Sequence, residues 1–510
     1  MRSAPRLLIG AYALLTISWL FATPPFGAFD EPAHYIRAAG IAHGQLLGPR
    51  PPASAEIVPP GASAARYAWT YHDLRIYKVS ASVLPARGGC SRAIGTRTCP
   101  AWTYVGNYPP LYYVLPGLVT RAATTADSGD RLARAVSAIL NLGFIALATL
   151  LLWDGTVFSL LGLLVALTPT IVFLGATVNP NGVEITASIA LVAAALRATR
   201  DFERIPPWLW LVLVLCAVVT ILERQLGPIW VLAAGGLSFA LLACRGQLRR
   251  FGSLCRRPLL GTLGAALIAL GLYIGWAAAA GTSHPVAFSP VPHSLLVGIR
   301  TLPSVLKSAV GSFGWGFVQM PPVPYIAWLV AVVVLTVLAA RVASSGERGV
   351  LVCSLIAWAI FTAVFMAGVY RHSGFQMQGR YVLPLMVLAP LLAGELLTQR
   401  ASRVAERTRQ ATTRCLIAVV GLGQLAAWWA FAAHARGTGE AYWRPVANAS
   451  LLSAKAWWLP SVHGWSPPGG WLPWMITALA GAVGMLACCR RPDDGEAAGR
   501  RAAVALHPVP

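Results

Sequence analysis

The residues best suited to chemistry lie close together near the N-terminus, where the sequence reads FDEPAHYIR. Asp30 and Glu31 are adjacent carboxylates, and carboxylates can accept a proton from a substrate hydroxyl or bind a divalent cation. On a helix, Glu31, His34 and Tyr35 lie on adjacent turns of one face, and Arg37 follows three residues after His34. The segment therefore predicts an acid–base or cation-binding site, although a capped, solvated helix explains the same spacing equally well.

The same segment carries the signals of a helix start. Asp30 is expected to cap the helix, and Pro32 lies in its first turn. The helix should run to about His43 and stop at Gly44.

A second candidate is the tyrosine-rich segment NYPPLYY, which contains Tyr108 and Tyr112. Two prolines end an extended stretch and start a short apolar helix. Tyrosines suit the headgroup layer of a membrane, so an aromatic belt is the simpler explanation.

A third candidate is the segment NPNGVE, which contains Asn181 and Glu184. A carboxylate at a helix start inside a membrane protein is a functional hypothesis by default. Glu184 could equally complement the dipole of that helix.

Two later segments complete the candidates. Trp315 lies in GSFGWG, a flexible aromatic stretch, and Arg380 lies in QMQGRYVLP, where the chain enters an apolar run. The Arg380 guanidinium could bind a phosphate bidentately, or it could anchor the chain at the membrane interface. Weaker phosphate candidates are Arg300, Lys307 and Arg371.

Composition indicates that membrane-spanning helices position these residues. The chain has 510 residues, of which 56% are hydrophobic and 11% charged, with a mean hydropathy of +0.63. Soluble domains have about a quarter charged residues, so one water-soluble core cannot bury this chain. Its long runs rich in Leu, Ala and Val favour helices over barrel strands. About twelve runs approach the roughly 20 residues of a spanning helix: 7–20, 132–153, 157–178, 185–196, 208–222, 229–244, 259–280, 325–340, 350–369, 381–397, 416–433 and 471–489.

The first run follows Arg2 and Arg6, as the apolar region of a signal peptide would. No clean small-residue cleavage site follows it, so we expect a retained first helix.

The net charge of +22 does not indicate a nucleic-acid partner. No basic face interleaved with aromatic residues suggests base stacking. Instead, the arginines cluster in short loops at the ends of apolar runs, the positive-inside pattern that orients helices and meets anionic membrane lipids. The clusters are Arg197–Arg204, Arg245–Arg257, Arg341–Arg348, Arg400–Arg414 and Arg490–Arg501.

These clusters predict a single integral membrane domain over residues 1–510, in the cell inner (plasma) membrane, with both termini cytoplasmic. If Leu111–Ala123 spanned the membrane, every later cluster would face outward, so we expect an interfacial helix there. The outer segments are then residues 25–130, 281–324 and 434–470, with short turns near Asn181 and Arg380, and residues 490–510 form a basic cytoplasmic tail.

Cys90 and Cys99 lie together in the long first outer loop. In an oxidising compartment, a disulfide between them is favoured over two free thiols.

The order of the motifs resembles the GT-C superfamily, multi-spanning glycosyltransferases that use polyprenyl-phosphate-linked sugars. More closely, it resembles a bacterial family of predicted membrane proteins of unknown function that is grouped with GT-C. The resemblance covers most of the chain. It rests on Asp30-Glu31, Tyr108–Tyr113, Arg131-Leu132 and Asn179–Asn181, and, for the bacterial family, on Phe29–Tyr35, Phe313–Trp315 and Gln378–Pro384.

The resemblance implies an all-α, GT-C-like polytopic fold, with interfacial helices in the first outer loop and an outward-facing active site. Asp30 or Glu31 would be the general base. An acceptor hydroxyl would attack the anomeric carbon, and the lipid phosphate would leave near Arg380 or Arg37. Many GT-C enzymes have another acidic residue after the third span, where this chain has Asn181. The metal is therefore left open, and no soluble outer domain is expected.

The sequence thus predicts a membrane glycosyltransferase that moves a sugar from a polyprenyl-phosphate donor to a glycan or lipid acceptor of the envelope. Two alternatives remain: a transporter or flippase of lipid-linked saccharides, and a non-catalytic envelope-assembly protein. A transporter should carry ionisable residues at the midplane of several spans, and most apolar runs have none. The predicted substrate-binding residues are His34, Tyr35, Arg37, Tyr108, Tyr112, Asn181, Glu184, Trp315 and Arg380.

Overall fold

The structure, a computed structural model, describes residues 3–50, 74–84, 98–281, 287, 289–316, 318–374, 377–438 and 465–488. Several predictions fall outside these residues: most of the last outer loop 434–470, the basic tail 490–510, and Cys90. Cys99 is disulfide-bonded.

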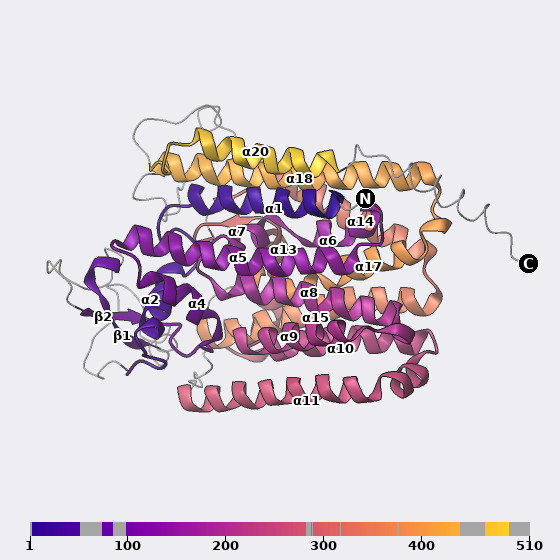
Figure 1. The fold of residues 1–510 in the computed structure, drawn as a ribbon, viewed down its shortest axis with the longest axis horizontal. Helices are drawn as coiled ribbons and strands as arrows, with labels where there is room; N and C mark the ends of the chain where they lie inside the picture. Colours follow the sequence, from indigo (N-terminus) through magenta and orange to yellow (C-terminus); the bar gives the residue numbers. More distant parts are fainter. Residues whose placement is uncertain are drawn as a thin grey trace, which may run out of the picture.

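Most of the described helices run along one direction and form an elongated bundle (Figure 1). The long helices are α1 (Ser3–Ala22), α5 (Ala126–Leu152), α8 (Pro180–Arg200), α9 (Pro207–Glu223), α10 (Gly227–Cys244), α11 (Leu248–Ala280), α14 (Pro322–Val342), α15 (Ser345–Ser373), α17 (Leu388–Gln399), α18 (Glu406–Thr438) and α20 (Leu472–Ala487). Short helices are α6 (Leu161–Ala166), α7 (Pro169–Gly175), α12 (Val291–Arg300), α13 (Leu302–Val310) and α16 (Leu383–Met386), with 3-10 turns η2 (Val157–Leu160), η3 (Phe202–Arg204), η4 (Gly379–Tyr381) and η5 (Ala401–Arg403). The predicted multi-pass helical membrane fold is confirmed.

Within the described residues, eight helices are long and apolar enough to cross a membrane, or nine if one bent pair is a single span. Four further apolar helices are shorter than a full span. The predicted count of twelve spans is therefore not confirmed, although each predicted run contains a helix. α5 begins earlier than predicted because Thr125 and Ser128 form a capping box, which places Asp130 inside the helix instead of in the outer loop.

The bent pair replaces the predicted straight span over residues 157–178. α6 and α7 meet at an angle of 76°, because Pro169 cannot continue a helix. The break frees carbonyl groups, and buried side chains bond them: Gln424 Nε2 donates to Leu167 O at 2.9 Å and Trp328 Nε1 donates to Val165 O at 3.0 Å.

One end of the bundle carries the smaller elements α2 (Glu31–Ala42), α4 (Leu111–Thr120), β1 (Arg75–Ser80), β2 (Thr98–Thr103) and η1 (Ala81–Val83) (Figure 1). β1 pairs antiparallel with β2, and a second pair joins β3 (Ser312–Phe313) to β4 (Val318–Gln319). These two small sheets were not predicted. α4 crosses α2 closely, because Gly117 packs against the Ala38 carbonyl with no space for a side chain.

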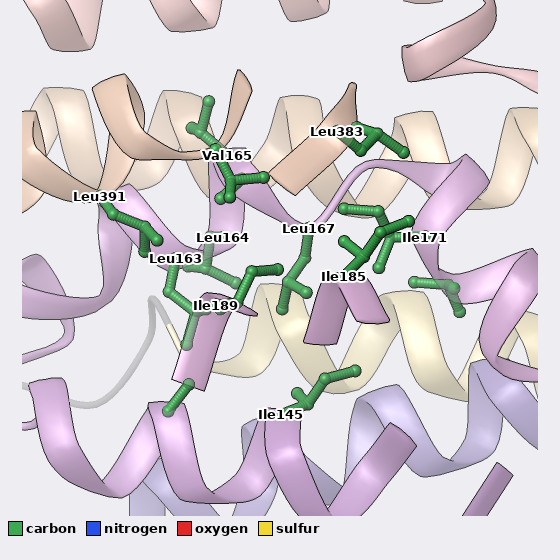
Figure 2. Close-up of a cluster of buried hydrophobic side chains, with 14 of the residues drawn as sticks. Ile145, Leu163, Leu164, Val165, Leu167, Ile171, Ile185, Ile189, Leu383 and Leu391 are labelled. Carbon is green, nitrogen blue, oxygen red and sulfur yellow. The ribbon is translucent and has the colours of Figure 1, made fainter. Parts of the chain in front are cut away.

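The hydrophobic core lies where α5, α6, α8 and α17 meet (Figure 2). Ile145, Leu163, Ile189 and Leu391 interdigitate there, one from each of these helices. α8 is central in the bundle, since 89% of the residues in its most apolar stretch are buried. In the most apolar stretch of α11, 11% are buried. α11 therefore presents most of its surface to lipid in a membrane.

The contact between α6 and α17 depends on glycine. Gly162 and Gly394 face each other, and a Cβ on Gly394 would lie 2.7 Å from the Gly162 Cα. We expect Gly394→Ala to force the helices apart and to destabilise the protein by about 1–3 kcal/mol, since such close crossings tolerate only small residues. Thermal unfolding in detergent measures this. Gly264→Ala on α11, with no atom within 4 Å of a built Cβ, is the matched control and should not lower the melting temperature.

Candidate active site

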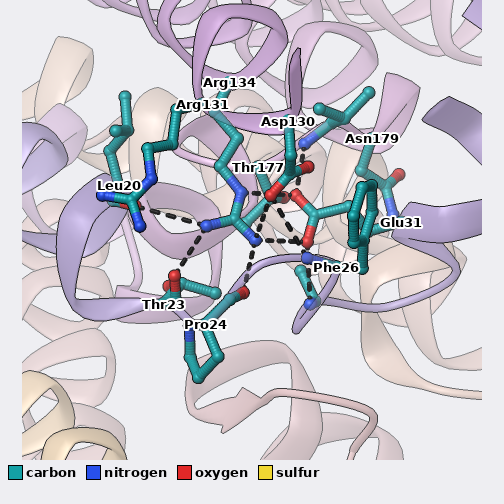
Figure 3. A network of polar contacts seen from close by, with 12 residues as sticks. Leu20, Thr23, Pro24, Phe26, Glu31, Asp130, Arg131, Arg134, Thr177 and Asn179 are labelled. Carbon is teal, nitrogen blue, oxygen red and sulfur yellow. Dashed lines mark hydrogen bonds and ion pairs between the residues drawn. The ribbon is translucent and has the colours of Figure 1, made fainter. Parts of the chain in front are cut away.

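A buried arginine on α5 joins the two carboxylates at the start of α2 and α5 (Figure 3). Arg134 donates from Nε to Glu31 Oε1 at 2.8 Å and from Nη2 to Glu31 Oε2 at 2.6 Å. Arg134 Nη2 also lies 3.0 Å from Asp130 Oδ2. All three side chains are at most 1% exposed. Such a pair is stable only if its hydrogen-bonding groups are satisfied.

The same guanidinium reaches the end of α1. It donates to the carbonyl oxygens of Thr23 and Pro24 at 2.7 Å each, and to that of Leu20 at 3.3 Å. Arg134 therefore fastens the segment between α1 and α2 to α5.

Glu31 has no lone pair left for a substrate. Besides Arg134, its two oxygens accept the backbone N–H groups of Ala28 and Val178 at 3.0 Å each. Four donors fill the four acceptor positions of a carboxylate. Of the two predicted catalytic acids, Glu31 therefore occupies a structural position.

We expect Arg134→Ala to destabilise the protein by about 3–5 kcal/mol, because it leaves buried carboxylates without a counter-charge. Arg131→Ala is the matched control: Arg131 pairs with Asp127, whose side chain is 51% exposed, and exposed pairs contribute at most about 1 kcal/mol. Chemical or thermal unfolding of both purified variants checks this, and equal losses would contradict the structural role of Arg134.

Asp30 points away from this network. It lies at the N-cap of α2, as predicted, but with φ 55° in the left-handed region and without a capping hydrogen bond from its side chain. Such a conformation is strained for a residue with a Cβ and is often found at functional sites. The carboxylate instead accepts hydrogen bonds from Tyr104 Oη and Arg380 Nη2, both at 2.6 Å.

Asp30 keeps access to solvent, with 24% of its side chain exposed. Burial alone would raise the pKa of its carboxyl group, but the Arg380 charge, aided by the Tyr104 hydrogen bond and by Arg224, holds that pKa below its usual value. Burial and the neighbouring carboxylate raise the pKa of Tyr104 well above its usual value, so Tyr104 remains a hydrogen-bond donor. Asp30 is therefore an ionised, accessible carboxylate.

Arg380 comes from η4, 350 residues further along the chain. Its guanidinium also bonds Gln378 Oε1 at 2.8 Å and Tyr381 Oη at 2.9 Å, and lies 4.1 Å from the centre of the Phe29 ring. The structure thus brings together Asp30 and Arg380, two predicted site residues from distant segments.

A second arginine, Arg224 at the end of α9, was not predicted. It donates to Asn181 Oδ1, to Glu184 Oε2 at 3.3 Å and to Tyr108 Oη at 3.3 Å. Its guanidinium lies 5.0 Å from the Tyr381 ring centre, and Arg380 lies 4.8 Å from the same ring. Three predicted residues, Tyr108, Asn181 and Glu184, therefore act on the site by positioning Arg224.

A sequence signal for Arg224 exists. It follows the fifth predicted span at the end assigned to the outside, where the positive-inside rule disfavours a short-loop arginine. Glu184 is fixed in turn by Trp230, whose Nε1 donates to Glu184 Oε1 at 2.9 Å.

His34 lies near Asp30, Arg224 and Arg380, and its imidazole is neutral. Burial, opposed by Asp30 and reinforced by the nearby arginines, lowers its pKa to about 3. Its Nδ1 is 2.8 Å from Tyr113 Oη, and its ring is 5.8 Å from that of Tyr108.

Three predicted residues pack away from Asp30. Tyr35 is fully buried and meets Phe26 edge to face. Arg37 donates to Tyr77 Oη and to the carbonyls of Gly106 and Tyr108, so it stabilises the loop before α4. Tyr112 bonds Ser137 on α5 at 2.7 Å.

Trp315 is half-buried in the turn between β3 and β4. The neighbouring Gly316 lies against Gln378 and Phe29, two neighbours of Arg380. This turn therefore borders the site. Within the part of the chain that the structure describes, the Trp315 ring makes no hydrogen bond or ring contact with Asp30.

The residues around Asp30 do not fit a divalent cation. Such ions need several oxygen ligands, whereas the carboxylate of Asp30 lies near two arginines and a histidine. Within the described parts of the chain, no three His, Cys, Asp or Glu side chains gather as metal ligands would. The arrangement is instead suited to an anion next to a general base.

The sequence profile of the family described as "Predicted membrane protein (DUF2142)" matches residues 13–389, so the chain belongs to this family. The match includes Asp30, Arg224 and Arg380, and it confirms the family predicted from the motifs. No protein of curated function has a sequence that matches this chain.

Two crystal structures of ArnT from Cupriavidus metallidurans are similar to this chain, one in the apo state and one bound to undecaprenyl phosphate. Each is 14% identical and has a TM-score of 0.44. The matches cover 96% and 97% of this chain, and 76% and 78% of the ArnT chains.

Proposed function

We propose that this protein is a glycosyltransferase of the inner membrane that transfers a sugar from a polyprenyl-phosphate donor to an envelope acceptor, a glycan or a lipid. The observation that carries the proposal is one accessible, ionised carboxylate, Asp30, bonded to the buried Arg380 and close to Arg224. The likeness of the motifs to the GT-C superfamily supports the same reaction class.

The reaction requires two groups that this site offers. The acceptor hydroxyl attacks the anomeric carbon of the donor sugar and gives its proton to an Asp30 carboxylate oxygen. The bond between the anomeric carbon and the phosphate oxygen breaks, and its electron pair leaves with the lipid phosphate. Arg380 and Arg224 stabilise that negative charge. Tyr104 and the neutral His34 orient Asp30 and polar groups of the sugar.

The extracytoplasmic location is supported by the arrangement of the bundle. The site lies at the end that carries α2, β1 and β2, whereas the N-terminal end of α1 and the arginine-rich connection between α10 and α11 lie at the opposite end (Figure 1). Arginine-rich short loops favour the cytoplasmic side, so the site would face outward, with both termini in the cytoplasm.

The transporter alternative has less support. It predicts broken helices in matched halves of the chain, and the described helices contain one strongly bent pair, α6 and α7. The cluster of charged groups at one end favours chemistry at a surface.

We expect Asp30→Asn to abolish function, because a general base contributes about 10²–10⁴-fold to rate. Complementation of a deletion strain, read out as envelope glycan composition, measures this at matched membrane levels of protein. Asp127→Asn, which removes an exposed acid from the same end of the bundle, is the control and should complement fully. Full complementation by Asp30→Asn would refute the proposed base.

The pH dependence follows from the environment of Asp30. Activity needs the carboxylate, so it falls as pH drops through the pKa of Asp30, which lies below the usual value of about 3.9. In Arg380→Gln the positive charge that lowers the pKa of Asp30 is removed, and burial then raises this pKa. The acid limb of the pH–rate profile should therefore move to higher pH. Release of polyprenyl phosphate from lipid extracts, followed against pH, checks this; an unmoved limb would contradict the role of the pair.

A further inference from the structure

Two consecutive short helices, α12 and α13, reverse direction at Thr301 beside the outward end of α15. α12 packs antiparallel to α15: Gly298 meets the Ala363 carbonyl with no room for a side chain, and the His293 and Tyr370 rings are 5.8 Å apart. α12 therefore runs from the end of α15 back toward its middle.

α13 returns toward the same end of the bundle. Its Lys307 ammonium lies 5.4 Å from the centre of the Tyr325 ring near the start of α14, and Tyr325 Oη bonds Gly311 O directly after α13. α14 and α15 join at their other ends, so the start of α14 and the end of α15 lie at one end of the bundle. The two short helices thus form a re-entrant hairpin.

The hairpin places a cation beside apolar surface. The apolar run of α15 ends at Val369. Ala363 lies six residues earlier, so it is about 9 Å along the helix from the end of that run. Arg300, near this level, is exposed, and so are Leu295, Leu296 and Ile299 on the same helix. An ionisable side chain among lipid-facing apolar residues is costly and is usually functional.

The hairpin is also joined to the candidate active site. The Gly379 N–H donates to Ser308 Oγ on α13 at 2.6 Å, and Gly379 packs against the Val305 carbonyl with no space for a Cβ. The next residue is Arg380. A ligand bound to the exposed face of α13 would therefore be separated by this helix alone from the segment that carries Arg380, the arginine that bonds Asp30.

We propose that the α12–α13 hairpin is the docking surface for the lipid phosphate of the donor, with Arg300 and Lys307 binding it before it reaches Arg380. This inference rests on the proposed function. The exposed apolar residues of α12 would contact the polyprenyl chain, and the two cations are complementary to a phosphate. Arg300 is the last residue of α12, directly before the reversal at Thr301, and Lys307 lies six residues past Thr301, about 9 Å along α13, so the phosphate would contact them in succession.

The experiment uses the full-length protein in phosphatidylcholine nanodiscs with a photoreactive polyprenyl monophosphate. Labelled peptides, identified by mass spectrometry, should map to residues 291–310. In the double variant Arg300→Gln, Lys307→Gln, labelling affinity should fall about 30-fold, since each charge near the surface contributes about 1 kcal/mol and 1.4 kcal/mol is tenfold. Arg249→Gln, an exposed arginine near the start of α11, is the control and should label like the wild type.

The possible failures can be distinguished. Labelling outside the hairpin in the wild type, or an unchanged affinity in a double variant with wild-type melting behaviour, would overturn the docking surface. Equal competition by phosphatidylglycerol would also overturn it, because the surface would then bind any anionic lipid. If any of these results were found while Asp30→Asn failed to complement, the docking surface would be refuted and the proposed function would stand. Labelling of the hairpin together with full complementation by Asp30→Asn would refute the proposed base and keep the docking surface.

Discussion

The arrangement of the site depends on the buried ion pair between Arg134 and Glu31. A guanidinium offers five N–H donors in a fixed plane, and here they are directed to two carboxylates and to the carbonyl groups that end α1. A charged group this deeply buried is tolerated because every part of it is bonded. The pair fixes the first turn of α2. Asp30, the residue before it, has a left-handed backbone conformation, and its side chain bonds Tyr104 and Arg380 instead of Arg134.

This constraint separates two adjacent carboxylates into different roles. Glu31 has all its acceptor positions filled by protein donors, whereas Asp30 shares Arg380 and remains partly exposed. In the resting site Asp30 and Arg380 neutralise each other. A phosphate that binds the guanidinium of Arg380 would weaken its bond to Asp30, and the carboxylate would then become a stronger base. In the proposed reaction, binding of the donor and activation of the base would thus be connected by one side chain.

The sequence predicted the parts of this molecule that follow from composition and local pattern. Apolar runs predicted where the helices lie, and helix-start signals predicted α2 with Asp30 at its N-cap position, although the Asp30 side chain makes no capping hydrogen bond. The roles of Asp30 and Glu31 could not be separated, because both are carboxylates at the same helix start and their partners come from distant segments: α5, the link between α7 and α8, and η4. Arg224 was missed because it belongs to no local motif, and its one signal, a short-loop arginine on the side assigned to the outside, appears only once the topology has been worked out. The small sheet β1–β2 was missed because its six-residue strands lack a clear alternation of apolar and polar residues.

The position of Arg380 in the chain has a consequence for biogenesis. The junction of α1, α2, α5 and the start of α8 is complete once about the first 180 residues have entered the membrane, whereas Arg380 bonds Asp30 across a separation of 350 residues. During synthesis Asp30 therefore lacks its main counter-charge until most of the later helices have been inserted. A nascent or truncated chain would carry Asp30 without Arg380, so the complete pair of Asp30 and Arg380 forms only at a late step of membrane integration.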